Sequence, residues 1–175
     1  MTDPRIPPLS RARPENDSAF IIERDDPARP DVRRLLDEHL ADMFLTSPAE
    51  SVHALDLEAL SAPGIRFWTA REGSTLVGCG ALKELTTDHA ELKSMRTTQQ
   101  ARGRGVAAAI LGHIIDDARH RGIGRLSLET GTQDYFAPAR RLYLRSGFIE
   151  CPPFAGYTLD PNSTFLTTLL AATAQ

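Results

Sequence analysis

A glycine-rich turn, RGRGVA at residues 102–107, stands between a predicted strand and a predicted helix. Gly103 and Gly105 lack a Cβ, so the backbone there can adopt positive φ and come close to a ligand. The helix that begins near Val106 presents its first unpaired N–H groups and the positive end of its dipole to this turn. The two arginines of the turn add cations, although surface arginines are also common on a solvated face. The turn is therefore predicted to bind a phosphate or a similar anion.

Two known glycine patterns compete for this turn. Residues 103–108 satisfy the dinucleotide-binding pattern G-x-G-x-x-G/A, and Glu129 lies near the end of the next predicted strand, where a ribose-binding acid is expected. In a dinucleotide fold the first glycine directly follows an apolar buried strand, whereas residues 91–97 alternate polar and apolar side chains and residues 98–102 intervene. The second pattern, Q/R-x-x-G-x-G/A, begins at Gln100 and fits more of the chain. No Lys-Ser/Thr pair follows the turn, which excludes a Walker A loop.

Strands and helices predicted from periodicity surround the turn. Asp31 can cap a first helix with an apolar stripe from Val32 to Phe44, and Ser47 to Glu50 form a capping box that predicts the start of a second helix. The remaining elements are expected, in chain order, as a strand at 19–23, a hairpin at 65–72 and 75–85, a strand at 91–97, a helix from 106 to about 121, a strand at 125–130, a helix at 138–146 and two short strands, the second at 164–170.

Composition narrows the class of protein. The chain has 175 residues, of which 41% are hydrophobic and 25% charged, and its net charge of −3 gives no basic excess for a nucleic-acid partner. Cys79 and Cys151 are far apart and form no CxxC pair, which predicts a reducing, cytoplasmic location and no metal site. No apolar run reaches the ~20 residues that a membrane span needs. We expect residues 1–18 to be a loose tail and residues 19–171 to form one domain.

The order of elements and two spaced motifs resemble the GCN5-related N-acetyltransferase (GNAT) family. The segment from Gln100 to Gly105 resembles the family's acetyl-CoA pyrophosphate signature, and ARRLYLRSGF at 139–148 resembles its A-x-x-L-Y-x-x-x-G-F segment. The likeness runs from about Ala19 to Leu170. It implies an α/β (α+β) fold with a mixed, mostly antiparallel central sheet of six to seven strands, about four flanking helices and a splayed central strand pair.

The resemblance also implies a cofactor site for acetyl-CoA as co-substrate. Backbone groups of the central strand would meet the pantetheine arm, the glycine turn would hold the pyrophosphate, and Tyr143 matches the tyrosine that protonates the coenzyme A sulfur. The implied cofactor-binding residues are Met95, Arg96, Thr97, Gln100, Arg102, Gly103, Arg104, Gly105, Val106, Ala107 and Tyr143. The chain departs from the family pattern at Thr97, where proline is common, and at Phe136, where asparagine is common. A tyrosine that simply packs as an aromatic is the alternative interpretation of Tyr143.

Acetyl transfer to an amine also needs the amine to be neutral. By the period of two, His89, Glu91, Lys93 and Met95 share one face of the central strand, so a carboxylate there can reach the cleft. Glu91 is the first choice as proton acceptor. The alternative bases are Glu129, Glu84 and His89, and some enzymes of this kind need no dedicated base. For each candidate, the other interpretation is a surface or paired side chain without a role in the reaction.

The predicted function is N-acetylation of a small-molecule amine by a monomer or homodimer. The polar residues Thr46, Ser47, Glu50 and His53 between the first two helices suit a small hydrophilic acceptor, and Arg66, Arg71, Lys83 or His53 are candidates to select a carboxylate-bearing amine. Residues 38–55 and 160–163 resemble a bacterial subgroup of the family whose acceptors are poorly defined. The alternatives are a non-catalytic acetyl-CoA-binding protein and a dinucleotide-dependent oxidoreductase that uses the same glycines.

Overall fold

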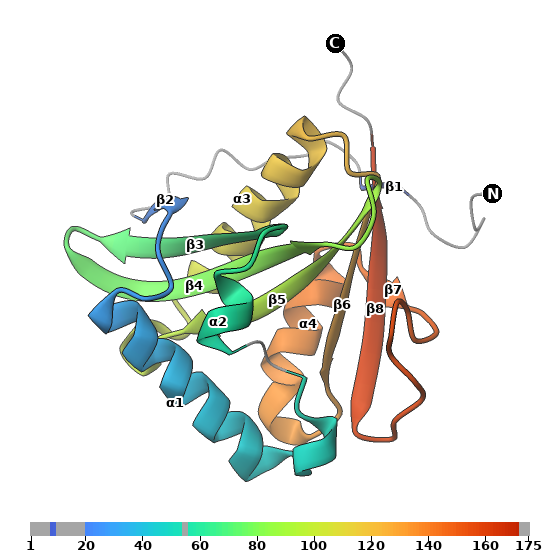
Figure 1. Ribbon diagram of the computed structural model, residues 1–175, viewed down its shortest axis with the longest axis horizontal. Helices are drawn as coiled ribbons and strands as arrows, with labels where there is room; N and C mark the ends of the chain where they lie inside the picture. The colour runs from blue at the N-terminus through green and yellow to red at the C-terminus, as the bar shows by residue number, and fades with distance from the viewer. Residues whose placement is uncertain (1–7, 10–19, 54–55, 172–175) are drawn as a thin grey trace.

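The computed structural model describes residues 8–9, 20–53 and 56–171, and places helices on both faces of one sheet (Figure 1). The strands are β1 (Pro8–Leu9), β2 (Ile21–Arg24), β3 (Ile65–Glu72), β4 (Thr75–Glu84), β5 (His89–Thr97), β6 (Arg125–Gly131), β7 (Ile149–Glu150) and β8 (Ser163–Leu170). The α-helices are α1 (Pro30–Thr46), α2 (Leu57–Leu60), α3 (Val106–His120) and α4 (Ala137–Arg145). Three short 3₁₀ helices are η1 (Ala49–Ser51), η2 (Gln99–Ala101) and η3 (Asp134–Phe136).

The sheet is mixed and mostly antiparallel, as predicted. Its order is β1-β8-β6-β5-β4-β3-β2, with β7 paired to β8, and the parallel pairs within the described residues are β5·β6 and β1·β8. β1 lies inside the stretch 1–18 that was expected to be a loose tail, where Pro8 and Leu9 align with the end of β8. The other residues of that stretch lie outside the described ones.

The two central strands are paired only over their first three residues and then separate. β5 and β6 pair in parallel only from His89↔Arg125 to Glu91↔Ser127, although β5 continues to Thr97 and β6 to Gly131. Ser94, three residues beyond the last β5·β6 pair, has φ of 52°, and the register between β4 and β5 shifts beside it. Residues 94 and 95 of β5 thus lie opposite the single residue Gly80 of β4, which is a β-bulge. A β-bulge bends the strand that carries the extra residue and re-aims its side chains. The predicted splay is therefore confirmed, and the β6-facing edge of β5 has no partner strand beyond Glu91 in the described structure.

The same bulge corrects one prediction about β5. Glu91 and Lys93 face the side of the sheet covered by α1 and α2, but Met95 packs into the core on the α3 side. A Cβ at Gly80 would lie 2.6 Å from the Met95 sulfur and 2.9 Å from Ile110 of α3. Met95 therefore does not share a face with Glu91 and Lys93, because the period of two is broken at Ser94.

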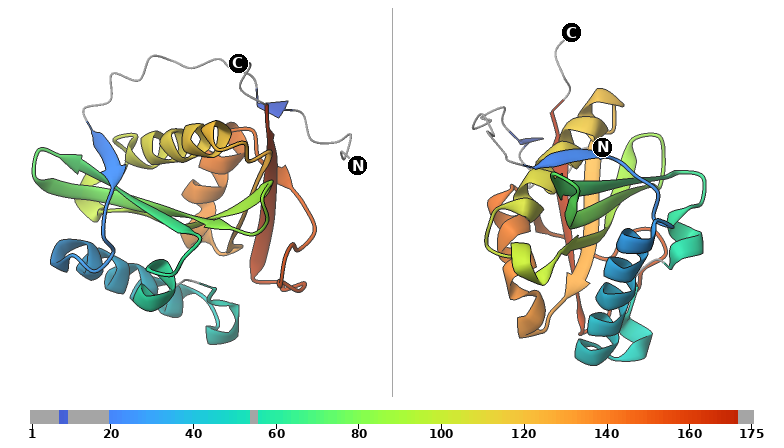
Figure 2. Two further views of the ribbon diagram at one scale, coloured as in Figure 1. Left: turned by 45° about the horizontal axis from the view of Figure 1, so that its top comes forward. Right: turned by 90° about the vertical axis from the view of Figure 1, so that its left-hand side faces the viewer.

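The helices form one layer on each side of the sheet, with α3 and α4 on one face and α1 and α2 on the other (Figure 2). The predicted helix at 106 to about 121 is confirmed as α3, and its residues at helical spacing, Val106, Ile110, Ile114 and Ala118, are all buried. α3 also lies very close to β4, where a Cβ at Gly78 would lie 2.9 Å from Val106. Burial of this apolar face fixes the start of α3, and so fixes the glycine turn in front of it.

The second helix does not begin at the predicted capping box. Ser47 instead ends α1, where its N–H donates to the Met43 carbonyl at 2.9 Å and its hydroxyl contacts the side-chain oxygen of Gln133 at 3.4 Å. α2 begins at Leu57 and is capped by Asp56, which accepts from the Ala59 N–H at 2.8 Å. The first helix also begins earlier than predicted, at Pro30 rather than after an Asp31 cap, and Phe44 at the end of its stripe is 53% exposed. Tertiary contacts therefore outweigh the local capping signals in this region.

A buried ion-pair cluster ties α1 to the sheet. Arg71 of β3 donates to Asp31 at 2.7 Å and to Asp25 at 3.1 Å, and its side chain is 9% exposed. We expect Arg71→Ala to lower the free energy of unfolding by about 3 kcal/mol, because it removes the shared partner of two carboxylates, one of which, Asp25, is buried. Urea denaturation measures this loss, with the exposed Arg33→Ala as a control that changes stability little.

The same variant should alter the acid dependence of stability. The hydrogen bond from Arg71 lowers the pKa of Asp31 below its usual value. Stability from a depressed carboxyl pKa is present above the unfolded-state pKa and is lost as the pH falls through the folded-state pKa. The gap in stability between wild type and Arg71→Ala should therefore shrink as the pH falls below about 4. A gap that does not change with pH would mean that Asp31 gains nothing from the ion pair.

Candidate active site

The glycine turn has the conformation that the sequence predicted. Gly103 and Gly105 have φ of 75° and 83°, in the left-handed region that favours glycine. A Cβ at either position would meet no atom within 4 Å, so backbone conformation rather than packing calls for glycine there. Gly105 is the N-cap residue of α3, and no side chain of the residues that the structure describes caps the helix. The first N–H groups of α3 are therefore available to an anion in front of the turn.

The two arginines of the turn differ in their surroundings. Arg104 donates to the Glu72 carboxylate of β3 at 2.7 Å, and both side chains are more than 40% exposed (44% and 43%). Arg102 is exposed and forms no ion pair within the described residues. Gln100, in η2, is exposed as well. Exposed ion pairs are weak, so both arginines can turn toward an anion.

Of the three strand residues expected at the cofactor, Arg96 uses its side chain elsewhere. Its guanidinium donates to Asp42 of α1 at 2.7 Å and to the Tyr135 hydroxyl at 2.9 Å. The edge of β5 at residues 95–97 faces the splay and lacks a partner strand in the described structure. This arrangement leaves backbone groups of residues 95–97 to contact a ligand there, beside the Met95 side chain that lines the cavity in the splay.

A small cavity of about 90 Å³ lies between the splayed strands. β5 and β6 form its walls, α1 and the loop after it lie on one side, and η3 and α4 lie on the other. The lining residues are His39, Met43, His53, Leu92, Lys93, Ser94, Met95, Leu128, Glu129, Thr130, Gly131, Phe136, Ala139 and Tyr143. The splay has thus brought Tyr143, Glu129 and His53 to one place.

Tyr143 enters this cavity from α4. Its side chain is 6% exposed and its ring lies edge-on to Phe148 at 5.8 Å, so it packs as an aromatic while also lining the cavity. Its hydroxyl forms no hydrogen bond with the described residues. Burial raises the pKa of the phenol above its usual value. The hydroxyl therefore stays protonated over the whole pH range in which enzymes usually work, as a proton donor must.

Phe136, one of the departures from the family pattern, also lines the small cavity. A Cβ at Gly131 would collide with its ring. The cavity wall at the end of β6 is consequently an aromatic ring, where an asparagine would offer an amide.

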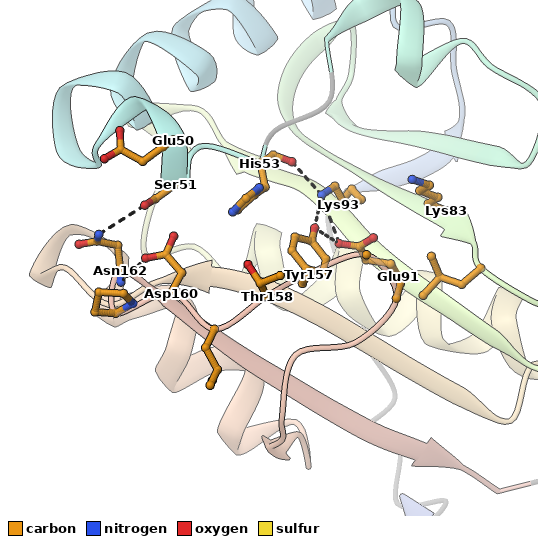
Figure 3. Close-up of a pocket in the computed structure, with 15 residues that line it drawn as sticks. Glu50, Ser51, His53, Lys83, Glu91, Lys93, Tyr157, Thr158, Asp160 and Asn162 are labelled. Atoms are coloured by element: carbon orange, nitrogen blue, oxygen red, sulfur yellow. Dashed lines mark hydrogen bonds and ion pairs between the residues drawn. The ribbon is translucent and has the colours of Figure 1, made fainter.

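A larger cavity of about 660 Å³ lies on the α1–α2 side of the sheet (Figure 3). Residues 50–53, strands β4 and β5, and the irregular segment 155–162 surround it. The lining residues are Glu50, Ser51, His53, Lys83, Leu85, Glu91, Lys93, Ala155, Gly156, Tyr157, Thr158, Leu159, Asp160, Pro161 and Asn162. Two of them, His53 and Lys93, also line the small cavity, so the two cavities adjoin at these side chains.

A cluster of three side chains forms the wall where the cavities meet. Lys93 donates to the His53 carbonyl and to the Tyr157 hydroxyl, each at 2.8 Å, and to Glu91 at 3.2 Å. The Tyr157 hydroxyl donates to Glu91 at 2.5 Å. Burial, and then the negative charge of Glu91, raise the pKa of Tyr157, so it remains the donor in this pair. Tyr157 could not be predicted from a pattern, because the segment 152–162 has neither strand nor helix periodicity.

The alternative proton acceptors lie in different surroundings. Glu129 accepts from the Ser163 hydroxyl at 2.7 Å, and its burial raises its carboxyl pKa. His89 contacts the Ser127 hydroxyl at 2.7 Å and, like Glu84, lines neither cavity. Burial lowers the pKa of His89. Glu84 forms an ion pair with Arg121. Glu129 therefore faces the cleft, whereas Glu84 and His89 do not.

Some of the residues predicted around the acceptor line the large cavity, and others do not. Glu50, His53 and Lys83 line the large cavity. Arg66 is paired with Asp117 at 2.9 Å and Arg71 with the carboxylates of the α1 cluster, so neither reaches the cavity. Thr46 turns its hydroxyl back to the Asp42 carbonyl at 2.7 Å. The prediction of an acceptor role for Arg66 and Arg71 is therefore wrong, because buried or partly buried acids bind both guanidinium groups.

Two further observations concern the described residues alone. They contain no group of three or more His, Cys, Asp or Glu side chains that could hold a metal ion. None of their helices is long and apolar enough to cross a membrane.

Comparison with known proteins gives a consistent result. The sequence profile of the Acetyltransferase (GNAT) family matches residues 31–148. A Bacillus subtilis (strain 168) protein, Uncharacterized N-acetyltransferase YsnE, is 55% identical over 146 residues, which span 83% of this chain and 97% of that protein. An IAA acetyltransferase of Azospirillum brasilense is 40% identical over 149 residues, which span 83% and 94%.

Solved structures show the same fold. A structure from Klebsiella pneumoniae, described as an acyl-CoA N-acyltransferase, superimposes with a TM-score of 0.73 at 28% identity over 88% of this chain and 100% of the other. A GNAT family acetyltransferase from Elizabethkingia anophelis, solved with acetyl-CoA bound, gives a TM-score of 0.64 at 17% identity over 87% and 99%. The chain therefore belongs to the acetyltransferase (GNAT) family, and is an N-acetyltransferase whose co-substrate is acetyl-CoA.

Proposed function

We propose that this enzyme transfers the acetyl group of acetyl-CoA to the amine of a small polar molecule bound in the large cavity. The observation that carries the proposal is the pair of adjoining cavities. One lies in the splay beside Tyr143, and the other is large, polar and open to the loop after α1. An amine in the large cavity would meet the splay at His53 and Lys93. The proposal takes residues 19–171 as the catalytic domain, acting in the cytoplasm as a monomer or homodimer.

The residues around the glycine turn fit acetyl-CoA. The backbone of residues 102–107, with Gln100 beside it, would hold the pyrophosphate in front of α3, and the open edge of β5 at residues 95–97 would hold the pantetheine arm by strand-like hydrogen bonds. When bound, acetyl-CoA supplies an acetyl thioester. The side chains of Arg102 and Arg104 would add charge at the rim.

Two side chains have proposed chemical roles. Tyr143 would protonate the departing sulfur, which its position in the small cavity and its protonated state support. Glu91, the first choice as proton acceptor, faces the large cavity but shares its carboxylate with Lys93 and Tyr157. These contacts favour a role in positioning the other two side chains.

The charges of the large cavity support a small polar acceptor. Glu50 and Asp160 lie toward one end and Lys83 toward the other (Figure 3). The hydrogen bond from Ser51 lowers the pKa of Asp160, which keeps this carboxylate charged. A molecule with an amine and at least one further charged group can find a counter-charge at either end. A long basic peptide would call for an extended acidic groove, and this cavity has charges of both signs.

A screen of amines tests the acceptor class. Amino acids, polyamines, aminoglycosides and lysine peptides should be compared by the release of free thiol from acetyl-CoA. We expect turnover with a free small amine that carries a second charge. Efficient turnover of a lysine peptide, with none of any small amine, would contradict the small-molecule proposal.

The same screen separates the alternative functions. A non-catalytic acetyl-CoA-binding protein would bind acetyl-CoA yet release no thiol with any amine. A dinucleotide-dependent oxidoreductase has little support, because η2 separates β5 from Gly103 and the sheet as a whole is mostly antiparallel. Binding of a nicotinamide dinucleotide, with no binding of acetyl-CoA, would favour the oxidoreductase instead.

A further inference from the structure

His53 occupies the boundary between the two cavities. Its ring points into the large cavity (Figure 3), and the residue also lines the small one. The ring stands edge-on to Tyr157, with centroids 5.1 Å apart and an interplanar angle of 88°. The backbone carbonyl accepts from Lys93 at 2.8 Å, which anchors this part of the loop to β5. The imidazole nitrogens form no hydrogen bond with the described residues, so they are available to a ligand.

The other polar groups around the boundary are less suited to accept a proton from an amine. The Lys93 ammonium already donates to three acceptors. Glu91 is engaged by two donors, and Glu129 lines only the small cavity. His39 also lines only the small cavity, and burial lowers its pKa to about 4, which makes it a weak base. His53 alone among these combines ring nitrogens that lack a hydrogen-bond partner with contact to both cavities in the described structure.

We propose that His53 accepts the proton of the acceptor amine, and that Glu129 is a positioning residue that stabilises the protonated imidazole. The inference rests on the proposed function. As the N–C bond forms between the neutral amine and the acetyl carbon, His53 takes one proton from the nitrogen. As the C–S bond breaks, Tyr143 gives one proton to the sulfur. The products are an amide and a thiol, and proton exchange with solvent restores His53 and Tyr143.

Glu129 suits this role because it lines the small cavity together with His53. Burial raises its carboxyl pKa, whereas the Ser163 hydroxyl and the positive charges of His53 and Lys93 act in the opposite direction. The other charged or titratable groups near His53 are Glu91, Lys93 and Tyr157 at the cavity wall, Asp160 across the large cavity, and Glu50 in η1.

Kinetics of two variants test the proton acceptor. With acetyl-CoA and the amine of highest turnover in the screen, His53→Ala and His53→Gln should each lower kcat by about a hundredfold. The KM for acetyl-CoA should stay unchanged, and added imidazole should restore part of the activity of His53→Ala. His120→Gln is the matched control, because His120 is exposed at the end of α3, remote from both cavities. A His53→Ala enzyme with wild-type kcat, when chemistry limits the rate, would overturn the proposal.

A second measurement needs no acceptor. The titration of the Glu129 carboxyl, followed by ¹³C NMR, should move to higher pH in His53→Gln, because a nearby positive charge has been removed. His120→Gln should leave it unchanged. If the Glu129 titration does not move in His53→Gln, the pairing of His53 with Glu129 is wrong, even if no amine in the screen is a substrate. Failure of the screen alone would instead contradict only the proposed acceptor class.

Discussion

Gly105→Glu should abolish binding of acetyl-CoA, with a loss of at least about a hundredfold in affinity, or about 2.7 kcal/mol. Gly105 caps α3 with φ of 83° and lies where the proposed pyrophosphate site meets the N-terminus of this helix. A glutamate there would place a side chain and a negative charge in the anion site. It would also have to adopt a left-handed backbone, which costs about 1–2 kcal/mol for most side chains. Isothermal titration calorimetry measures the affinity directly.

Two controls separate charge from backbone strain and from effects on the fold. Gly112→Glu makes the same substitution at an exposed glycine in the middle of α3, where a Cβ meets nothing within 4 Å, and should leave affinity unchanged. Gly105→Asn adds no charge, and asparagine tolerates positive φ better than other residues do, so it should weaken binding much less than glutamate does. If a folded Gly105→Glu protein binds acetyl-CoA as tightly as wild type, the assignment of the turn is wrong.

The parts of the fold that the sequence predicts well depend on short-range physics. The glycine turn and the inner face of α3 follow from positive φ, helix ends and a 3.6-residue period, all of which are local. The hairpin of β3 and β4 follows from alternation around Gly73, which has φ of 58°. The splay of β5 and β6 was an implication of the family resemblance, since nothing local to either strand predicts it.

The predictions that failed concern contacts between distant segments. The bulge at Ser94 breaks the alternation of β5 and sends Met95 to the α3 side, yet nothing in the residues 89–97 marks it. Ser47 has a good capping sequence, but the end of α1 and Gln133 engage it instead. Arg71 is a plausible cavity cation by sequence and a buried ion-pair partner in the structure. In each case the partner lies more than twenty residues away or on another element.

In the candidate site, too, residues within local motifs could be predicted, whereas residues that depend on distant contacts could not. Tyr143 and the turn could be assigned in advance because each lies within a spaced motif. Tyr157 could not, since it lies in an irregular segment and its importance comes from hydrogen bonds to Glu91 and Lys93 of β5. His53 was predicted only as one of several polar residues near the acceptor. Its position between two cavities depends on the splay and on the loop after α1 together.

Tyr143→Phe should lower kcat by about a hundredfold, or about 2.7 kcal/mol in the activation free energy, while leaving the affinity for acetyl-CoA nearly intact. The ring packs against Phe148 in either variant, so the fold and the shape of the small cavity should be preserved. Only the hydroxyl is lost, and it matters when the sulfur departs. Steady-state kinetics with the best amine of the screen, together with calorimetry of acetyl-CoA binding, separate these two quantities.

Tyr135→Phe is the matched control for loss of a phenolic hydroxyl. Tyr135 lines neither cavity, and its hydroxyl contacts Asp42 and the Arg96 side chain, so kcat should change little. The raised pKa of Tyr143 adds a second expectation: its ionisation should not produce a basic limb in the pH profile of wild-type kcat below about pH 10, because the buried phenol keeps its proton there. An unchanged kcat in Tyr143→Phe, with chemistry shown to be rate-limiting, would remove this residue from the mechanism and leave the departing thiolate to be protonated by water.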